Sequence, residues 1–301
     1  MNLFDQLVEQ AMRSENALKT VRPAVEKELL HHDILREMSR AGWLARLTFI
    51  GGTCLRTCYG SPRLSEDLDF AGGPDFVPDR LAELGPTLEK ALMGKYGLPV
   101  RVSPPVREEG EVSTWKVRLQ TRPTSKHLPA QRIHIDICAV PSHRARPALL
   151  RNAYGVNMGT EGLILQVESR EEILADKWVA LAFRPNRVKY RDLWDMIWLD
   201  RQGSHLEETL VFQKLNDRKR TRPAFLSVLR DRIDDLENHS EHQRAFRKEM
   251  DRFLFASDLL EATQRPDFWS VLILHLREHA TKMASYGPRI GWAPNSRPSL
   301  S

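Results

Sequence analysis

The sequence predicts an α/β (α+β) protein, in which a mixed sheet flanked by helices is followed by an all-helical C-terminal lobe. Two patterns predict the sheet. Residues 47–50 form a short apolar, β-branched run, and residues 132–138 alternate strictly between apolar and polar side chains. The lobe is predicted by residues 204–279, which are polar and amphipathic with helical periodicity and show no strand pattern. A chain of 301 residues can bury one large core or two modest ones, and we favour two.

Four segments are expected along the chain. Residues 1–44 should form helices that pack on the core, and we assign them no chemistry. The core should span residues 45–168 and the helical lobe residues 169–282. Residues 283–301 are rich in Gly, Pro and Ser and should form a flexible tail.

Composition indicates a soluble globular protein without a membrane span. Lys and Arg number 45 against 40 Asp and Glu, which gives a net charge of +5 and is compatible with a nucleic-acid partner without proving one. No apolar run approaches the length of a membrane helix. The first residues include Asp5, Glu9 and Glu15, which a signal peptide would not carry. The three cysteines show no metal-type spacing, so we expect a reducing, cytoplasmic setting.

A paired-glycine turn follows the first predicted strand. Gly51 and Gly52 would allow the backbone to turn tightly and approach a ligand. The helix expected from about Thr53 to Tyr59 would point its free N–H groups at this turn, which favours an anion such as a phosphate.

Two carboxylates follow on the next predicted strand. Asp67 and Asp69 are two residues apart, so their side chains should share one face. In the later alternating segment, Asp136 faces away from the apolar side. It is either an ordinary polar residue of a half-exposed strand or a third carboxylate that strand pairing brings beside the first two. Such a group of oxygens near a phosphate-binding turn suits Mg²⁺.

A helix pair is predicted after the sheet. Ser169 opens the first helix, which should run to about residue 183, and residues 190–201 should form the second. Lys177 lies on the first helix and Asp195 on the second. The pair could be stitched by surface ion pairs, each worth little, or could carry part of an active site.

These motifs resemble a known family. The first is formed by Gly51-Gly52-Thr53, Leu55-Arg56 and the run Arg63-x-Ser65-x-Asp67-Leu68-Asp69-Phe70; the second combines a Lys-x-x-Ala-Leu helix at Lys177 with an Arg-Asp-x-x-Asp helix at Arg191. Together they resemble the signatures of the AbiEii/AbiGii (MenT-like) toxin family of nucleotidyltransferases, within the DNA polymerase β-like superfamily. The resemblance covers roughly residues 45–200.

The resemblance implies roles for individual residues. Asp67, Asp69 and Asp136 would hold Mg²⁺, with two ions in the active complex. Lys177 would grip the triphosphate of an NTP donor, and Asp195 would belong to the active site by orienting this lysine. The remaining nucleotide-binding residues would be Gly51, Gly52, Thr53, Arg56, Arg63 and Ser65. Ser65 either caps its loop or, if phosphorylated, blocks the site.

The resemblance also implies the toxin half of a toxin–antitoxin pair. The expected partners are a cognate antitoxin and an RNA acceptor, most simply the 3′ end of tRNA. A basic cluster in the lobe would either bind the RNA backbone or be a set of solvated helix ends: Lys214, Arg218, Lys219, Arg220 and Arg222. The alternatives are transfer of a nucleoside monophosphate to a protein or small-molecule hydroxyl, and a non-catalytic member that binds RNA or a partner.

Overall fold

The computed structural model describes most of the chain: residues 2–13, 21–106, 112–123, 130–185, 187–254 and 267–286. Parts of all four expected segments lie outside the described residues, among them residues 14–20 of the N-terminal helices, 107–111 of the core, 255–266 of the lobe and most of the tail. Residues 283–285, which we assigned to the tail, belong instead to the last helix.

A seven-stranded mixed sheet forms the centre of the fold, with the order β3-β4-β5-β2-β1-β7-β6. β2 is parallel to β5 and β1 to β7, and the other neighbouring pairs are antiparallel. The fold class predicted from the sequence is therefore confirmed. The strands are β1 (Thr48–Ile50), β2 (Leu68–Ala71), β3 (Val100–Ser103), β4 (Val112–Leu119), β5 (Gln131–Cys138), β6 (Ala145–Leu149) and β7 (Ile164–Glu168).

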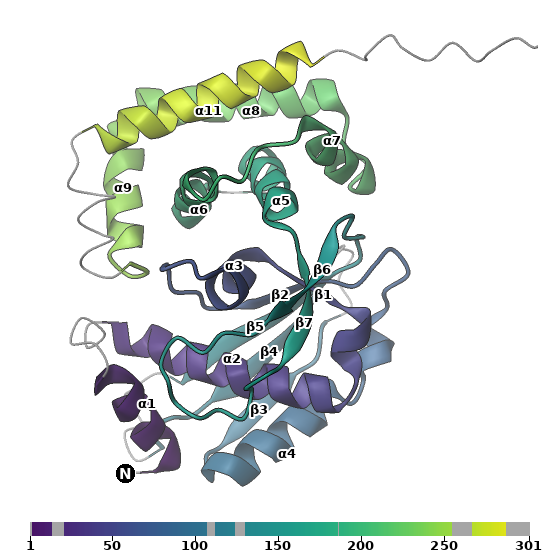
Figure 1. Ribbon diagram of the computed structural model, residues 1–301, viewed down its shortest axis with the longest axis vertical. Coiled ribbons are helices and arrows are strands. Elements are labelled where there is room, and N and C mark those ends of the chain that lie inside the picture. Colours follow the sequence, from purple (N-terminus) through teal and green to yellow (C-terminus); the bar gives the residue numbers. More distant parts are fainter. Residues whose placement is uncertain are drawn as a thin grey trace, which may run out of the picture.

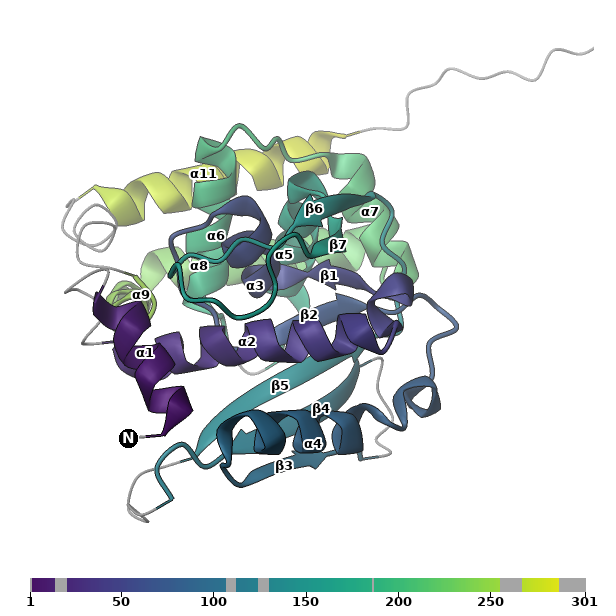
Figure 2. The same ribbon diagram turned by 60° about the horizontal axis from the view of Figure 1, so that its bottom comes forward.

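Two long helices cover the apolar face of the sheet. Leu68, Phe70, Ile133 and Ile135 are almost completely buried, as period-2 alternation on β2 and β5 requires. Figure 2 shows α2 over these strands and α4 beside it over β3 and β4; α2 contacts β5, and α4 contacts β3. The elements of this side are α1 (Leu3–Arg13), α2 (Arg22–Arg40), the 3₁₀ turns η2 (Trp43–Arg46) and η3 (Pro78–Leu81), and α4 (Leu84–Tyr96).

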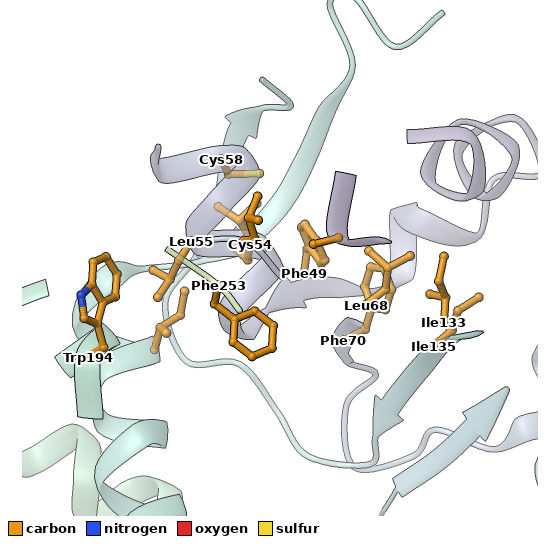
Figure 3. Close-up of a cluster of buried hydrophobic side chains, with 14 of the residues drawn as sticks. Phe49, Cys54, Leu55, Cys58, Leu68, Phe70, Ile133, Ile135, Trp194 and Phe253 are labelled. Atoms are coloured by element: carbon orange, nitrogen blue, oxygen red, sulfur yellow. The ribbon is translucent and has the colours of Figure 1, made fainter. Parts of the chain in front are cut away.

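The remaining helices lie on the opposite side of the sheet (Figure 1). They are α3 (Gly51–Tyr59), α5 (Arg170–Phe183), α6 (Tyr190–Arg201), α7 (Glu208–Asp217), α8 (Arg222–Asn238), α9 (Ser240–Met250) and α11 (Phe268–Ser285). Their buried side chains join those of the sheet in one continuous cluster. In Figure 3, Phe49 of β1 and Leu55 of α3 lie in this cluster with Phe253 and Trp194. The helical layer is thus anchored on the sheet through α3.

One strand was not predicted from the sequence. β6 contains Pro147, which cannot donate a ladder hydrogen bond and is usually evidence against a strand. β6 lies at the edge of the sheet and pairs only with β7, so a proline is tolerated there.

Strand register brings Asp136 beside the two carboxylates of the first motif. Asp69 on β2 lies directly opposite Asp136 on β5, and Asp67 immediately precedes β2. Both strands direct their apolar residues to α2, so these carboxylates face the helical layer. None of the described helices is long and apolar enough to cross a membrane.

Candidate active site

A cavity of about 190 Å³ lies between the carboxylate face of the sheet and the helical layer. Gly51 and Gly52 form part of its wall, and its lining is strongly charged. Its acidic residues are Glu66, Asp67, Asp69, Asp136, Asp176 and Asp192, and its basic residues are Arg63, Lys177, Arg184, Lys189, Arg191 and Arg218.

Asp67, Asp69 and Asp136 meet at the floor of this cavity. Oδ1 of Asp67 accepts a hydrogen bond of 3.1 Å from the backbone N–H of His134, and Thr114 donates one of 2.7 Å to Oδ1 of Asp136. Burial, reinforced by the two neighbouring carboxylates, raises the pKa of Asp69 to about 6. Burial also raises the pKa of Asp136, with a further contribution from Asp67.

These three residues suit a hard divalent cation. They offer only carboxylate oxygens, the ligands that Mg²⁺ prefers. The raised pKa of Asp69 means that its negative charge lacks a sufficient counter-charge, which a bound cation would supply. Elsewhere in the described residues, two clusters of potential ligands have donor atoms within 4.8 Å of one another. The oxygens of Asp67, Asp69 and Asp136 do not all come as close together as this.

The two glycines are required by close contacts. Gly51 has φ +75°, and a Cβ there would lie 2.8 Å from Oδ2 of Asp69. A Cβ on Gly52 would lie 2.4 Å from Nη2 of Arg63 and 3.3 Å from Oγ of Ser65. Helix α3 begins at Gly51, two residues earlier than expected, and its first turn has no side-chain cap. Its N–H groups therefore remain available for an anion.

We predict that Gly52→Ala lowers both stability and activity. Arg63 is fully buried and held by Asp195, so it cannot move aside to accommodate a methyl group. Overpacking of this kind costs about 1–3 kcal/mol in the free energy of unfolding, measurable by urea denaturation. Gly94→Ala is the matched control, because this helical glycine has no atom within 4 Å of the added Cβ. It should stabilise the protein by about 0.5–1 kcal/mol. Equal effects of the two substitutions would contradict the packing argument.

Two expected nucleotide-binding side chains have other partners. The hydroxyl of Thr53 is fully buried and donates to the backbone oxygen of Asp67, and it lies 2.7 Å from Oγ of Ser65. Arg56 bonds to Glu28 and does not line the cavity. The prediction that these two side chains contact the phosphates is therefore corrected: they hold the loop that carries Asp67.

Helix α2 braces the same loop, a role that we did not predict. Its buried Glu28 accepts hydrogen bonds from the backbone N–H of Ser65, from Arg56 and from the hydroxyl of Tyr154. One turn further along, Nε2 of His31 lies 3.0 Å from the backbone oxygen of Glu66. The sequence did not single out Glu28 or His31, because the buried side of α2 also contains Glu26, His32 and Asp33.

Lys177 is held by two carboxylates of α6. Its Nζ lies 2.6 Å from Oδ1 of Asp192 and 2.6 Å from Oδ2 of Asp195. Asp195 is fully buried and also receives two hydrogen bonds from Arg63, of 2.6 and 2.8 Å. Asp192 also bonds to Arg184, and these cations hold the pKa of Asp192 far below its usual range. Asp195 thus orients Lys177 from behind the cavity wall, while Asp192, which we did not single out, faces the cavity.

Lys189 is a further cavity residue that sequence reasoning missed. The other basic side chains of the lining all lie within 4.0 Å of a carboxylate, whereas no such partner is found for Lys189 in the described part of the chain. Burial lowers the pKa of Lys189, and Arg184 and Arg191 lower it further. Its position two residues before the Arg-Asp-x-x-Asp motif was the available signal.

The basic cluster of the lobe is not one surface. Lys214 is buried and bonds to Glu168 and Glu172, so the prediction that it binds RNA is wrong. Arg222 donates to backbone oxygens at the end of α11. Arg218 bonds to Asp176 and lines the cavity. Two further residues of the cluster are exposed: Lys219 and Arg220.

Comparisons with known proteins agree with this geometry. The model of the family described as nucleotidyl transferase AbiEii toxin, type IV TA system, matches residues 33–273. Among solved structures, the chain is similar to MenT4, a nucleotidyltransferase toxin from Mycobacterium tuberculosis H37Rv. The TM-score is 0.51 at 21% identity, over 94% of this chain and 90% of MenT4.

A second similar structure is JHP933 from Helicobacter pylori, with a TM-score of 0.47 at 18% identity, over 87% of this chain and 94% of that one. Curated proteins give no significant match. The MenT4 comparison supports the fold, and the family match spans most of the chain, including both motifs. The chain therefore belongs to the AbiEii family and is a nucleotidyltransferase toxin of a toxin–antitoxin system.

Proposed function

We propose that this enzyme transfers a nucleoside monophosphate from an NTP to an RNA acceptor, most simply the 3′ end of tRNA, and thereby blocks translation. The observation that carries the proposal is the cavity itself. Three carboxylates on its floor face Lys177 and Lys189, and an uncapped helix start forms its wall. This arrangement suits a triphosphate bound together with Mg²⁺.

The donor phosphates would be bound by the α3 N–H groups, Lys177 and Lys189. Asp192 and Asp195 hold the ammonium group of Lys177 in place. Asp67, Asp69 and Asp136 would hold Mg²⁺, which when bound supplies positive charge to the entering and leaving oxygens.

Asp136 is suited to take the proton of the acceptor hydroxyl. It lines the cavity, and the hydroxyl of Thr114 fixes the orientation of its carboxylate. The acceptor oxygen would attack the α-phosphorus in line, forming a new P–O bond as the bond to the bridging oxygen breaks and pyrophosphate leaves.

An RNA acceptor is supported by the positive charge around the cavity mouth. Arg218 lines the cavity, and the exposed Lys219 and Arg220 follow it directly in the chain. These three residues remain as RNA-binding candidates, because the backbone of RNA is bound chiefly by such cations. A cognate antitoxin is the expected second partner, as in other toxin–antitoxin pairs.

The test is incubation of the purified protein with total tRNA, Mg²⁺ and each of the four α-labelled NTPs, resolved on a denaturing gel. We expect label on tRNA with the wild type and none with Asp67→Asn. Label on protein instead of RNA would favour the protein acceptor of the alternative function. Absence of label on any macromolecule would contradict the proposed acceptor.

We predict that Lys189→Met raises the KM for NTP. A charge-assisted hydrogen bond to a phosphate is worth about 1.5–3 kcal/mol, or roughly 10–150-fold. Lys248→Met is the matched control, since Lys248 is exposed on α9 and does not line the cavity. Steady-state kinetics with varied NTP would measure both variants. An unchanged KM and kcat in Lys189→Met would remove this lysine from the site.

A further inference from the structure

A second group of potential metal ligands lies apart from the cavity. Asp200 stands near the end of α6, and His275 and His279 lie on α11. One donor atom from each of the three lies within 4.8 Å of the others, and none of these residues lines the active-site cavity. Figure 1 shows α11 on the outer side of the helical layer. The cluster therefore joins the last described helix to a helix that carries active-site residues.

The spacing of the two histidines suits chelation. They are four residues apart on one helix, so their side chains share a face, and their ring centroids are 4.4 Å apart. Bonds of about 2.0–2.1 Å in a tetrahedral site put donor atoms roughly 3.4 Å from one another. Small rotations of the three side chains would bring the donors from their present separation to that distance.

The donor atoms are also free to bind. Within the described part of the chain, no hydrogen bond is found for the imidazole of His275, the imidazole of His279 or the carboxylate of Asp200. Burial lowers the pKa of His275, and burial together with His275 lowers that of His279 to about 4. Both rings are therefore neutral at pH 7, the form that binds metal. Nearby, Glu278 favours and Lys282 opposes the approach of a cation.

A similar cluster nearby serves as a contrast. Asp235, His239 and His242 also bring donor atoms within 4.8 Å. There, however, His242 uses both ring nitrogens, one toward the hydroxyl of Tyr190 and the other toward Asp235. His239 contacts Asp235 as well. This second cluster is satisfied by its own hydrogen bonds and has less need of an ion.

We propose that Asp200, His275 and His279 bind a divalent transition metal of the Zn²⁺ class, with water completing the coordination. Two imidazoles and a carboxylate are ligands that Zn²⁺ accepts readily, whereas Mg²⁺ prefers oxygen alone. The exposure of Asp200 and the partial exposure of both histidines leave a path for the ion and its water.

The ion would fasten α11 to both helices of the second sequence motif. Asp200 belongs to α6, which carries Asp192 and Asp195. The ring of His279 packs against Trp178 at 5.8 Å between ring centroids, and Trp178 follows Lys177 on α5. Metal binding would therefore stabilise the helices that orient Lys177, without contact with the substrate.

The test is Zn²⁺ binding by the chelator-treated full-length protein, measured by calorimetry in excess Mg²⁺, which occupies the carboxylates of the cavity. We expect one equivalent to bind to the wild type and to raise its Tm. Replacing an outer partner of a metal ligand costs about 10–100-fold in affinity, so His279→Gln, which removes a ligand, should cost at least about 100-fold. Asp200→Asn should weaken binding as well. Substitution of Co²⁺ should give a visible absorption band that both variants lose.

His239→Gln is the matched control, and it should bind Zn²⁺ as the wild type does. The proposal is overturned if the wild type takes up no Zn²⁺, or if His279→Gln and Asp200→Asn bind it with wild-type affinity. Loss of binding in His239→Gln alone would assign the ion to the other cluster and would equally overturn it. Because binding and Tm are the readouts, the outcome does not depend on the acceptor of the transferase.

Discussion

Asp69→Asn should abolish nucleotide transfer and at the same time stabilise the metal-free protein. Asp69 lies at the centre of the carboxylate group, opposite Asp136 in the sheet register. Removing one charge from a metal-binding triad should lower kcat by at least about a thousandfold, or roughly 4 kcal/mol in transition-state stabilisation. Label incorporation under single-turnover conditions would measure this loss.

The gain in stability follows from the pKa of Asp69, which folding raises from 3.8 to about 6. A folded-state pKa above the unfolded value means that the folded protein binds the proton more tightly. The contribution of this proton binding to the free energy of unfolding is complete below pH 3.8 and is lost as the pH rises through about 6. At pH 7.5 the ionised carboxylate therefore destabilises the fold by about 1–3 kcal/mol, a penalty that asparagine lacks.

Thermal unfolding at pH 7.5 and pH 5 would test this linkage. The advantage of Asp69→Asn in Tm should be a few degrees at pH 7.5 and should shrink at pH 5. Added Mg²⁺ should raise the Tm of the wild type and not that of the variant. Asp75→Asn removes the same charge at an exposed position outside the cavity and should change neither activity nor Tm. A variant at Asp69 that transfers nucleotide normally, or that melts below the wild type at pH 7.5, would contradict the assignment.

The parts of the site that local patterns determine could be predicted from the sequence. Strict alternation on β5 fixed the face of Asp136, and the same period on β2 fixed that of Asp69. Their juxtaposition needed only parallel pairing of the two strands, which the structure has. The helix over residues 190–201 was predicted with the observed bounds. The division of the chain into four segments stays a prediction.

Long-range partners could not be predicted in the same way. Glu28 reaches its loop only once α2 packs on the sheet, and nothing in its helix identifies Ser65 as a partner. Arg63 was expected to face phosphates, but its guanidinium pairs with Asp195, which lies 132 residues later in the sequence. A charged residue in a helix gives no indication of whether it is buried, and Lys214 is the clearest case.

Lys214→Met should destabilise the protein strongly, because Lys214 is the centre of a buried charge cluster. Its Nζ lies 2.6 Å from Glu168, 2.6 Å from Glu172 and 3.0 Å from Asp176. Glu168 belongs to β7 and the other two acids to α5, so Lys214 ties its own helix, α7, to the sheet and to α5. Removing it leaves buried carboxylates without their cation, which costs about 3–5 kcal/mol in the free energy of unfolding. Urea denaturation would measure the loss.

Glu168→Gln is the matched control within the same cluster. Burial and the nearby Asp176 raise the pKa of Glu168 well above its ordinary value, so the ionised form of this side chain is disfavoured. Glu172 stays ionised, since Lys214 and the N–H groups of His143 and Arg144 lower its pKa. Glutamine removes this disfavoured charge and keeps the shape of the side chain. We therefore expect a change below about 1.5 kcal/mol, much smaller than for Lys214→Met.

The two variants together separate a structural from an RNA-binding role for Lys214. If Lys214 contacted RNA, its replacement would weaken RNA affinity and reduce the salt dependence of that affinity by about one phosphate contact. The free energy of unfolding would stay unchanged. If Lys214 instead forms a buried ion pair, its replacement would lower the free energy of unfolding. RNA affinity, measured on the folded fraction, would keep its salt dependence. A stable Lys214→Met with weakened RNA binding would therefore restore the prediction made from the charge pattern. We expect the opposite, because 1% exposure leaves the ammonium no route to a phosphate.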